Sequence, residues 1–319
     1  MEYLPWVEKY RPKKIDEIIS HDQNIETIKK MLEGGSLPHL LFHGTPGTGK
    51  TSLILAIAND LYGSSKNLMI MKLDASDDRG INSVREEIKG FAEKSNMFCK
   101  GVKLIILDEA DSMTFDAQFA LRRIIEKYSR TTRFCLICNY ENKIIPAIRQ
   151  RCAKFRFSPI NTYHIQKKLS DVCQNENLVY DDNVLETISY LSRGDLRKSI
   201  NFLQSLSLQT NHITLNLCYK IAGVPSLPEV EEIIDTLLNP KIDFDNANNK
   251  IDQLIKSQGY SLSIVLKELV SYLINNKMNK LETKKLALYL SEMADLENRV
   301  IKSTFGDIYM SGLVGIFKS

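Results

Sequence analysis

The stretch LLFHGTPGTGKTS, at residues 40–52, runs from large apolar side chains into glycine-rich backbone and ends on a lysine and two hydroxyl side chains. From Gly44 onward it fits the pattern G-x-x-x-x-G-K-[ST]. Glycines let a backbone curl closely around an anion, and the first N–H groups of the following helix point at that anion. The pattern predicts a phosphate-binding loop that opens a helix, because a plain glycine-rich turn leaves Lys50 and Thr51 unexplained.

The chemistry of such a loop assigns roles to its polar residues. The Lys50 side chain is expected to reach the β- and γ-phosphates, and the Thr51 hydroxyl is expected to bind Mg²⁺. The residues predicted to bind ATP in this segment are Gly44, Thr45, Pro46, Gly47, Thr48, Gly49, Lys50, Thr51 and Ser52.

A second polar segment follows the apolar run of KLIILDEAD, residues 103–111. Asp108 and Glu109 stand where the predicted strand ends, so Asp108 can hold Mg²⁺ and Glu109 can position or deprotonate the attacking water. Asn139 ends the next strand and can orient that water and contact the γ-phosphate. The alternatives are a helix N-cap for the acidic pair and a turn residue for the asparagine.

Short β-rich runs alternate with helical runs between residues 39 and 160. The strands are expected at 39–44, 68–74, 103–108, 133–139 and 154–158, and the helices near 50–62, 81–95, 115–129 and 144–149. Continuous apolar runs such as LIIL at 104–107 are typical of parallel strands covered on both faces. The pattern predicts an α/β fold with a doubly wound parallel sheet, whose ligands bind at the carboxyl ends of the strands.

Beyond residue 161 the chain is expected to be helical, without further strands. The segment GVPSLPE at 223–229 carries a glycine and two prolines and is the best candidate linker. The predicted domains are a nucleotide-binding domain at 1–160, a helical domain at 161–224 and a second helical domain at 225–319. In the last domain, helices are expected at 229–238, 243–257, 261–276 and 281–301, followed by a short final element.

The composition is that of an ordinary globular protein, because 43% of the 319 residues are hydrophobic and 25% are charged. The net charge is +3, but residues 122–156 hold ten basic side chains against Glu126 and Glu141, which gives this segment a charge of +8. Such a local excess fits a polyanion or an acidic neighbour, and a solvated basic face is the alternative.

Cysteine usage and apolar runs argue against other classes of protein. Cys135 and Cys138 form a C-x-x-C inside an apolar strand, and no second pair completes a zinc site, so buried reduced thiols are expected. No apolar run approaches the length of a membrane span, and MEYLPWVEKYRP at 1–12 lacks the apolar core of a signal peptide. These features predict a cytosolic or nuclear protein with no membrane partner.

With these motifs in place, the chain resembles the AAA+ ATPases and, more narrowly, the small subunits of replication factor C, the eukaryotic sliding-clamp loader. The matching motifs span about residues 4–205 and are, in order, PWVEKYRP, GTPGTGKTS, LDASDDRGI, LIILDEADSMT, ALRRIIEKYSRTTRFCLICNY, QRCAKFRF and GDLRKSINFLQ. The resemblance implies an AAA+ P-loop module followed by a helical lid and an all-helical collar that joins subunits.

The resemblance adds residues to the predicted ATP site. It implies that the adenine and ribose lie among Val7, Arg11, Pro12 and Ile19, near the N-terminus. It also implies that Arg197, in GDLRKS, contacts the γ-phosphate from the lid, at the start of a helix whose positive end favours an anion.

Arg151, in QRC, matches the arginine that such subunits insert as a finger into the neighbouring subunit's ATP site. An arginine in this position neutralises charge in the transition state. Gln150 stands where the family usually has serine, which changes the local sequence of this motif but leaves the guanidinium intact. The predicted catalytic residues are Lys50, Asp108, Glu109, Asn139 and Arg151.

The resemblance also implies partners, namely other replication factor C subunits in a heteropentamer, a sliding clamp and primer–template DNA. It places Arg79, Arg85 and Lys143 on DNA phosphates, which bind well at the starts of helices. Met97 and Phe98, within KSNMFCKGVK at 94–103, are candidate clamp contacts, and core packing explains them equally well. The expected location is the nucleus, and the expected cofactors are ATP and Mg²⁺.

Two other functions fit parts of the same sequence. A structural subunit could bind nucleotide without hydrolysing it and supply only Arg151, but the intact Lys50 and Glu109 argue against this. A hexameric AAA+ DNA translocase would need strand-separating or pore loops, and none is recognisable. The favoured interpretation is an ATP-hydrolysing subunit of a clamp loader.

Overall fold

The structure is a computed structural model that describes residues 4–35, 37–76, 81–94, 101–276, 282–303 and 309–318. Internal contacts divide the chain into two compact units. The first unit comprises Met1–Leu178 and Leu185–Asn211, and the second comprises Val179–Val184 and His212–Ser319. Each unit has its own hydrophobic core.

The first unit is built on a parallel sheet, which has five strands in the part of the chain that the structure describes. In spatial order these strands are β2 (Ile70–Asp74), β3 (Lys103–Asp108), β4 (Thr132–Cys138), β1 (His39–Gly44) and β5 (Cys152–Phe157). The order confirms the predicted doubly wound α/β fold, because β1 lies inside the sheet and the chain extends it on both sides. Strand β2 begins at Ile70 rather than at 68, because the short helix α4 (Lys66–Met69) takes up the preceding residues.

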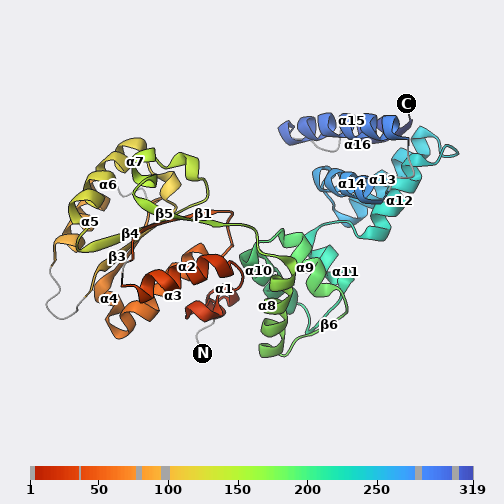
Figure 1. Cartoon of the computed structure of the whole chain (residues 1–319). Coiled ribbons are helices and arrows are strands. Elements are labelled where there is room, and N and C mark those ends of the chain that lie inside the picture. The colour runs from red at the N-terminus through yellow and green to blue at the C-terminus, as the bar shows by residue number, and fades with distance from the viewer. Residues whose placement is uncertain are drawn as a thin grey trace. The chain divides into compact units, whose positions relative to one another are not determined.

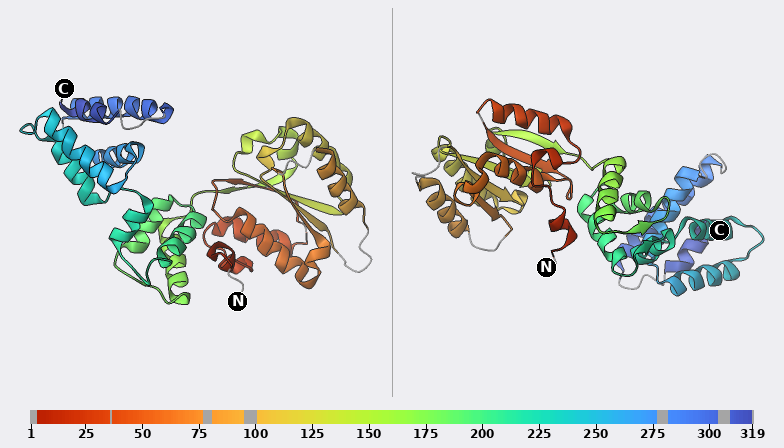
Figure 2. Two further views of the ribbon diagram at one scale, coloured as in Figure 1. Left: turned by 180° about the vertical axis from the view of Figure 1, so that it is seen from behind. Right: turned by 90° about the horizontal axis from the view of Figure 1, so that it is seen from below.

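Helices cover both faces of this sheet (Figures 1 and 2). One face packs against α2 (Asp22–Glu33) and α3 (Lys50–Tyr62), and the other against α5 (Ile81–Glu93), α6 (Phe115–Tyr128) and α7 (Pro146–Arg149). Successive side chains of a strand point to opposite faces, so Leu40 and Phe42 join the first core while Leu41 joins the second. This burial on both faces is the reason that the central strands are continuously apolar.

The remaining elements of the first unit lie at its N-terminus and after β5. The short helix α1 (Trp6–Lys9) and the 3₁₀ turn η1 (Ile15–Glu17) precede α2. The helices α8 (Thr162–Asn175), α9 (Val184–Ser192) and α10 (Leu196–Ser207) follow the sheet and are called the lid helices below. Shorter 3₁₀ turns lie at η2 (Gly63–Ser65), η3 (Ala110–Ser112) and η4 (Glu141–Lys143).

The second unit corrects two expectations from the sequence. Strands β6 (Val179–Tyr180) and β7 (His212–Ile213) pair in parallel, although no strand was expected beyond residue 161. Two residues are too short to show any periodicity, so only the pairing reveals them. The expected linker at 223–229 is also partly helical, because Ser226 and Glu229 form a capping box that opens α12 (Leu227–Leu238).

Helices pack around the core of the second unit. In chain order, the elements after β7 are α11 (Leu215–Ala222), α12, α13 (Phe244–Gln258), α14 (Leu262–Asn276), α15 (Thr283–Lys302) and α16 (Met310–Lys318). Buried Leu, Ile and Val side chains of α12 to α16 form this core. The helical character of the chain's last third is therefore as predicted.

The described cysteine thiols are free, as the sequence predicts. Cys135, Cys138, Cys173 and Cys218 are buried, and Cys152 is half-buried. Burial raises the pKa of the Cys138 thiol to about 12, which keeps it neutral at physiological pH. Among the helices that the structure describes, none has the length and apolar character needed to cross a bilayer.

Candidate nucleotide-binding site

A cavity of about 270 Å³ lies over the loop between β1 and α3. Fifteen residues from the predicted ATP and catalytic sets line it: Val7, Arg11, Pro12, Ile19, Pro46, Gly47, Thr48, Gly49, Lys50, Thr51, Ser52, Asp108, Glu109, Asn139 and Arg197. These residues come from the N-terminal segment, the loop, the ends of β3 and β4, and the lid helix α10. The fold thus brings together residues that are up to 190 positions apart in the sequence.

Lys50 is the first residue of α3, and its ammonium group is buried at the base of the cavity. It donates hydrogen bonds to the carbonyls of Gly44 and Thr45 at 2.7 and 2.8 Å, and to Asn139 Oδ1 at 3.1 Å. Gly44 and Thr45 are therefore partners of Lys50 and do not appear among the residues that line this cavity. Burial lowers the pKa of Lys50, so an anionic ligand at this position is favoured.

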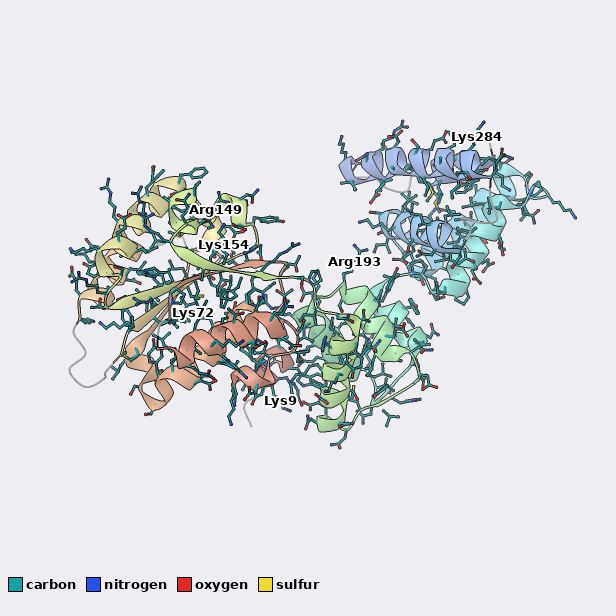
Figure 3. All side chains as sticks on the ribbon, viewed as in Figure 1. Lys9, Lys72, Arg149, Lys154, Arg193 and Lys284 are labelled. Carbon is teal, nitrogen blue, oxygen red and sulfur yellow. The ribbon has the colours of Figure 1, made fainter. Side chains whose placement is uncertain are left out.

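The end of β3 supplies oxygen atoms suited to a hard cation. The Thr51 hydroxyl donates a hydrogen bond to Asp108 Oδ2 at 3.1 Å. A hydroxyl and a carboxylate are the kinds of ligand that Mg²⁺ prefers, so the two residues fit this ion. The Lys72 ammonium, on β2, lies 3.8 Å from the same Asp108 oxygen (Figure 3), and Asp74 is the register partner of Asp108 on the neighbouring strand.

Glu109 has a constrained backbone. Its φ angle is +52°, in the left-handed region that few non-glycine residues adopt. Its N–H donates to Asp108 Oδ1 at 3.2 Å, and its carbonyl accepts from the N–H and hydroxyl of Ser112 at 2.9 and 2.7 Å. Such strain persists where neighbouring contacts hold it, and it is concentrated at functional sites. These contacts hold the exposed carboxylate of Glu109 next to Asp108, one of the two residues that fit Mg²⁺.

Asp111 fixes the position of Asn139, a role that the sequence did not reveal. Its Oδ2 atom accepts hydrogen bonds from the N–H groups of Asn139 and Tyr140 at 3.2 and 3.1 Å. The Asn139 amide oxygen in turn accepts from Lys50. The segment from Asp108 to Asp111 therefore connects the ends of β3 and β4 to the phosphate-binding lysine.

The lid helix α10 begins against the loop. Asp195 is buried and caps the helix by accepting a hydrogen bond from the Lys198 N–H at 3.1 Å. The Leu196 N–H donates to the Gly47 carbonyl at 3.2 Å. Arg197 follows directly and lines the cavity. The start of this helix thus brings a guanidinium group into the lining of the cavity.

Arg151 is exposed and is not among the residues that line the cavity. Its Nη2 atom lies 2.5 Å from Glu126 Oε1, and its Nη1 donates to the Ala147 carbonyl at 2.6 Å. Glu126 also accepts from Arg122 at 3.0 Å. The exposed guanidinium is therefore held against Glu126 on α6 and Ala147 on α7.

Several basic side chains of segment 122–156 form ion pairs within the chain. Glu141 lies 2.7 Å from Lys154 and 3.8 Å from Arg149, two side chains labelled in Figure 3. With Glu126 it accounts for both acidic residues of the segment. These ion pairs leave the net charge of the segment at +8, because both glutamates are already counted in it.

The predicted DNA contacts are only partly within the described residues. Lys143 is exposed on η4, with its ammonium 5.2 Å from the centre of the Tyr140 ring. Arg85 belongs to α5. Arg79, and the candidate clamp contacts Met97 and Phe98, lie outside the described residues.

Several lining residues were not predicted. They are Tyr10, Ile18, Asp74, Ile137, Cys138, Ile160, Lys168, Leu196 and Ile200. Asp74 could have been found, because it ends an expected strand just as Asp108 does. Lys168 and Ile200 lie on lid helices whose local pattern contains no signal for a ligand, so only the tertiary structure identifies them.

Three models of protein families match the chain. The model "ATPase family associated with various cellular activities (AAA)" matches residues 40–160, and "RCF1/5-like, AAA+ ATPase lid domain" matches residues 167–208. The model "Replication factor C C-terminal domain" matches residues 225–315.

Curated relatives are similar over almost the whole chain. "Probable replication factor C subunit 5" of Dictyostelium discoideum is 45% identical, covering 99% of this chain and 91% of the relative. The chain belongs to the replication factor C small-subunit family. Other relatives in this family are replication factor C subunit 5 of Homo sapiens, 42% identical over 99% and 92% of the two chains, and subunit 3 of Saccharomyces cerevisiae, 38% identical over 100% and 94%.

Membership of the replication factor C family confirms the resemblance that the motifs indicated. The chain is a clamp-loader subunit with an AAA+ ATPase domain that binds nucleotide, a lid and the family's helical C-terminal domain. Solved structures share the fold at low identity. The RuvB Holliday junction branch migration motor of Thermotoga maritima has a TM-score of 0.53 at 18% identity, covering 83% of this chain and 90% of that one.

Proposed function

We propose that the chain binds ATP together with Mg²⁺ in the cavity over the phosphate loop and hydrolyses it within the heteropentameric clamp loader. The observation that carries the proposal is one connected set of contacts at the base of this cavity. Lys50 contacts Asn139, and Thr51 contacts Asp108. Glu109, after strand β3, and Arg197, on the lid helix α10, also line this cavity.

Each of these residues has a role in the proposed reaction. Lys50 and Arg197 neutralise the β- and γ-phosphates, and Glu109 orients and deprotonates the attacking water through a hydrogen bond. Thr51 and Asp108 would hold Mg²⁺, which supplies further neutralisation of phosphate charge. Asp111 keeps Asn139 beside the γ-phosphate position by binding its backbone.

The proposed partners are those that membership of the replication factor C family supports. Arg151 completes the ATP site of an adjoining replication factor C subunit, so bound ATP links neighbouring subunits until its γ-phosphate leaves. The γ-phosphate provides the differential contact that such a switch requires. In the nucleus, the assembled ring opens a sliding clamp, grips primer–template DNA and releases the closed clamp after hydrolysis, during replication and repair.

Single-turnover phosphate release tests hydrolysis at this site. In a heteropentamer that carries Glu109→Gln, we expect release from this subunit to fall by about 10²–10⁴-fold, while ATP affinity stays within about twofold. Glu33→Gln, which changes an exposed carboxylate of α2, is the matched control. An unchanged rate for Glu109→Gln would instead identify a non-hydrolysing scaffold subunit.

Salt dependence tests the proposed DNA contacts separately. Replacing Arg79, Arg85 and Lys143 with alanine should weaken binding to all DNA sequences alike. The slope of the logarithm of the binding constant against the logarithm of the salt concentration should become less steep by about 0.9 for each phosphate that is no longer neutralised. Lys284→Ala, on the exposed surface of α15, is the control (Figure 3). A slope that matches the wild type would contradict the assignment.

A further inference from the structure

The N-terminal helix α1 is attached to the lid helices. Glu176, which follows α8, accepts two hydrogen bonds on one oxygen: from the Lys9 ammonium at 2.6 Å and from the Tyr10 hydroxyl at 2.5 Å. The Trp6 N–H donates to Gln204 Oε1 on α10 at 3.1 Å. Lys9 on α1 is labelled in Figure 3. The ring centroids of Trp6 and Tyr10 lie 6.4 Å apart in an edge-to-face arrangement.

The next residues are attached to the sheet module instead. The Lys13 carbonyl accepts a hydrogen bond from Asn59 at 3.0 Å, and the Ile15 N–H donates to Asp60 at 3.5 Å. Both partners lie on α3, the helix that the phosphate loop opens. The segment from Trp6 to Ile15 therefore spans from the lid to the core, and Arg11 and Pro12 lie on the span and line the cavity.

The attachment to Glu176 is partly shielded from water. The side chain of Glu176 is 18% exposed. Burial acts to raise the pKa of this carboxyl group, but the hydrogen bonds from Lys9 and Tyr10 outweigh it, so the pKa is lowered. A charged acceptor with two donors on one oxygen forms a stronger and better oriented contact than a neutral hydrogen bond.

We propose that Glu176 and Gln204 are positioning residues for the wall that binds the nucleotide base. They tie Trp6, Lys9 and Tyr10 to the lid, so the wall of Val7, Arg11 and Pro12 takes its position from the lid helices. The lid also contacts the phosphate loop through Leu196 and Gly47. The lid helices thus position both the base-binding wall and the phosphate loop. The purine base is bound when the lid contacts this loop. This inference rests on the proposed function, with the base of ATP placed among Val7, Arg11 and Pro12 as the family resemblance implies.

The test compares a ligand that has a base with one that lacks it. ATP and inorganic tripolyphosphate are titrated against the full chain by equilibrium dialysis. Glu176→Ala should weaken ATP binding by about five- to tenfold, the scale of the net contribution of one ordinary hydrogen bond, and change tripolyphosphate binding by less than about twofold. Tyr10→Phe, which removes only a hydroxyl, should show the same selectivity with a smaller loss. In the heteropentamer, KM for ATP should rise while kcat stays unchanged.

Glu186→Ala, which changes an exposed carboxylate of α9, is the control and should bind both ligands like the wild type. Unchanged ATP affinity in both Glu176→Ala and Tyr10→Phe would overturn the inference, and so would equal losses for ATP and tripolyphosphate. If the wild type itself showed no preference for ATP over tripolyphosphate, the placement of the base would be wrong, which is a distinguishable failure.

Discussion

The Asp195 carboxylate lies against the α-carbon of Gly47, in the space that any other side chain at position 47 would occupy. An ideal Cβ on Gly47 would stand 1.7 Å from Asp195 Oδ1. Asp195 cannot easily withdraw, because it is buried and caps α10. The loop therefore requires glycine at position 47 for a reason beyond phosphate access, namely the docking of the lid helix.

A pair of glycine substitutions separates this contact from backbone strain. Gly47 and Gly49 both have positive φ, of 69° and 94°. Within the part of the chain that the structure describes, however, no atom lies within 4 Å of a Cβ placed on Gly49. Gly49→Ala should lower the free energy of unfolding by about 1–2 kcal/mol through strain alone. Gly47→Ala should lower it by about 1 kcal/mol more, because the cap of α10 is also displaced. Urea denaturation measures both losses, and equal losses would argue against the contact between Asp195 and Gly47.

Arg151 should act on another subunit's site and not on its own. In the separate chain, Arg151→Ala is expected to leave ATP affinity unchanged, because this side chain pairs with Glu126 and does not line the cavity. In the heteropentamer, hydrolysis at the adjoining site should fall by roughly 10³-fold or more, measured under single-turnover conditions. Lys154→Ala, at another paired and exposed cation, provides the comparison. A large loss of ATP affinity in the separate chain would contradict a role in trans.

Lys72 should compete with Mg²⁺ for the Asp108 carboxylate. Its ammonium is 3.8 Å from Asp108 Oδ2, and two unit charges at this distance interact by about 1 kcal/mol in water. Lys72→Gln should therefore lower the Mg²⁺ concentration for half-maximal ATP binding by about three- to fivefold. Fluorescent ATP titrated with Mg²⁺ measures the shift, with Lys66→Gln, an exposed lysine bound to Asn59, as the control. A higher Mg²⁺ requirement in Lys72→Gln would reverse the assigned role.

His39 should make the first unit sensitive to mild acid. Its Nδ1 accepts a hydrogen bond from the Phe134 N–H at 3.2 Å, and burial, helped by Arg133, lowers its pKa from 6.5 to about 4. Between these values the unfolded chain binds a proton that the folded chain does not. The contribution of this group to the free energy of unfolding is complete above pH 6.5 and is lost as pH falls toward 4, by about 2 kcal/mol once solvent screening of this half-buried ring is allowed for. The free energy of unfolding, measured from pH 7 to pH 4, should change less with pH in His39→Gln than in the wild type. Parallel curves for the two proteins would refute the effect.

The local chemistry of the site could be predicted from the sequence, because short-range rules determine it. The glycine spacing before Lys50 and the apolar run before Asp108 each specify a backbone shape within a few residues, and both elements appear with the expected bounds. The carboxyl ends of parallel strands meet at one edge of a sheet, so Asp108 and Asn139 could also be expected to lie together.

Tertiary structure alone decided which distant side chains support this site. The Tyr10 and Glu176 side chains are 166 positions apart, and Asp195 meets Gly47 across the start of a separate helix. Neither pair leaves a periodic or compositional signal, since a hydrogen bond between remote segments depends on how whole elements pack. The amino-acid sequence thus determined the phosphate loop and the strand ends, whereas the fold determined how the lid and the N-terminal helix close around them, because contacts of that kind exist only after the helices have docked.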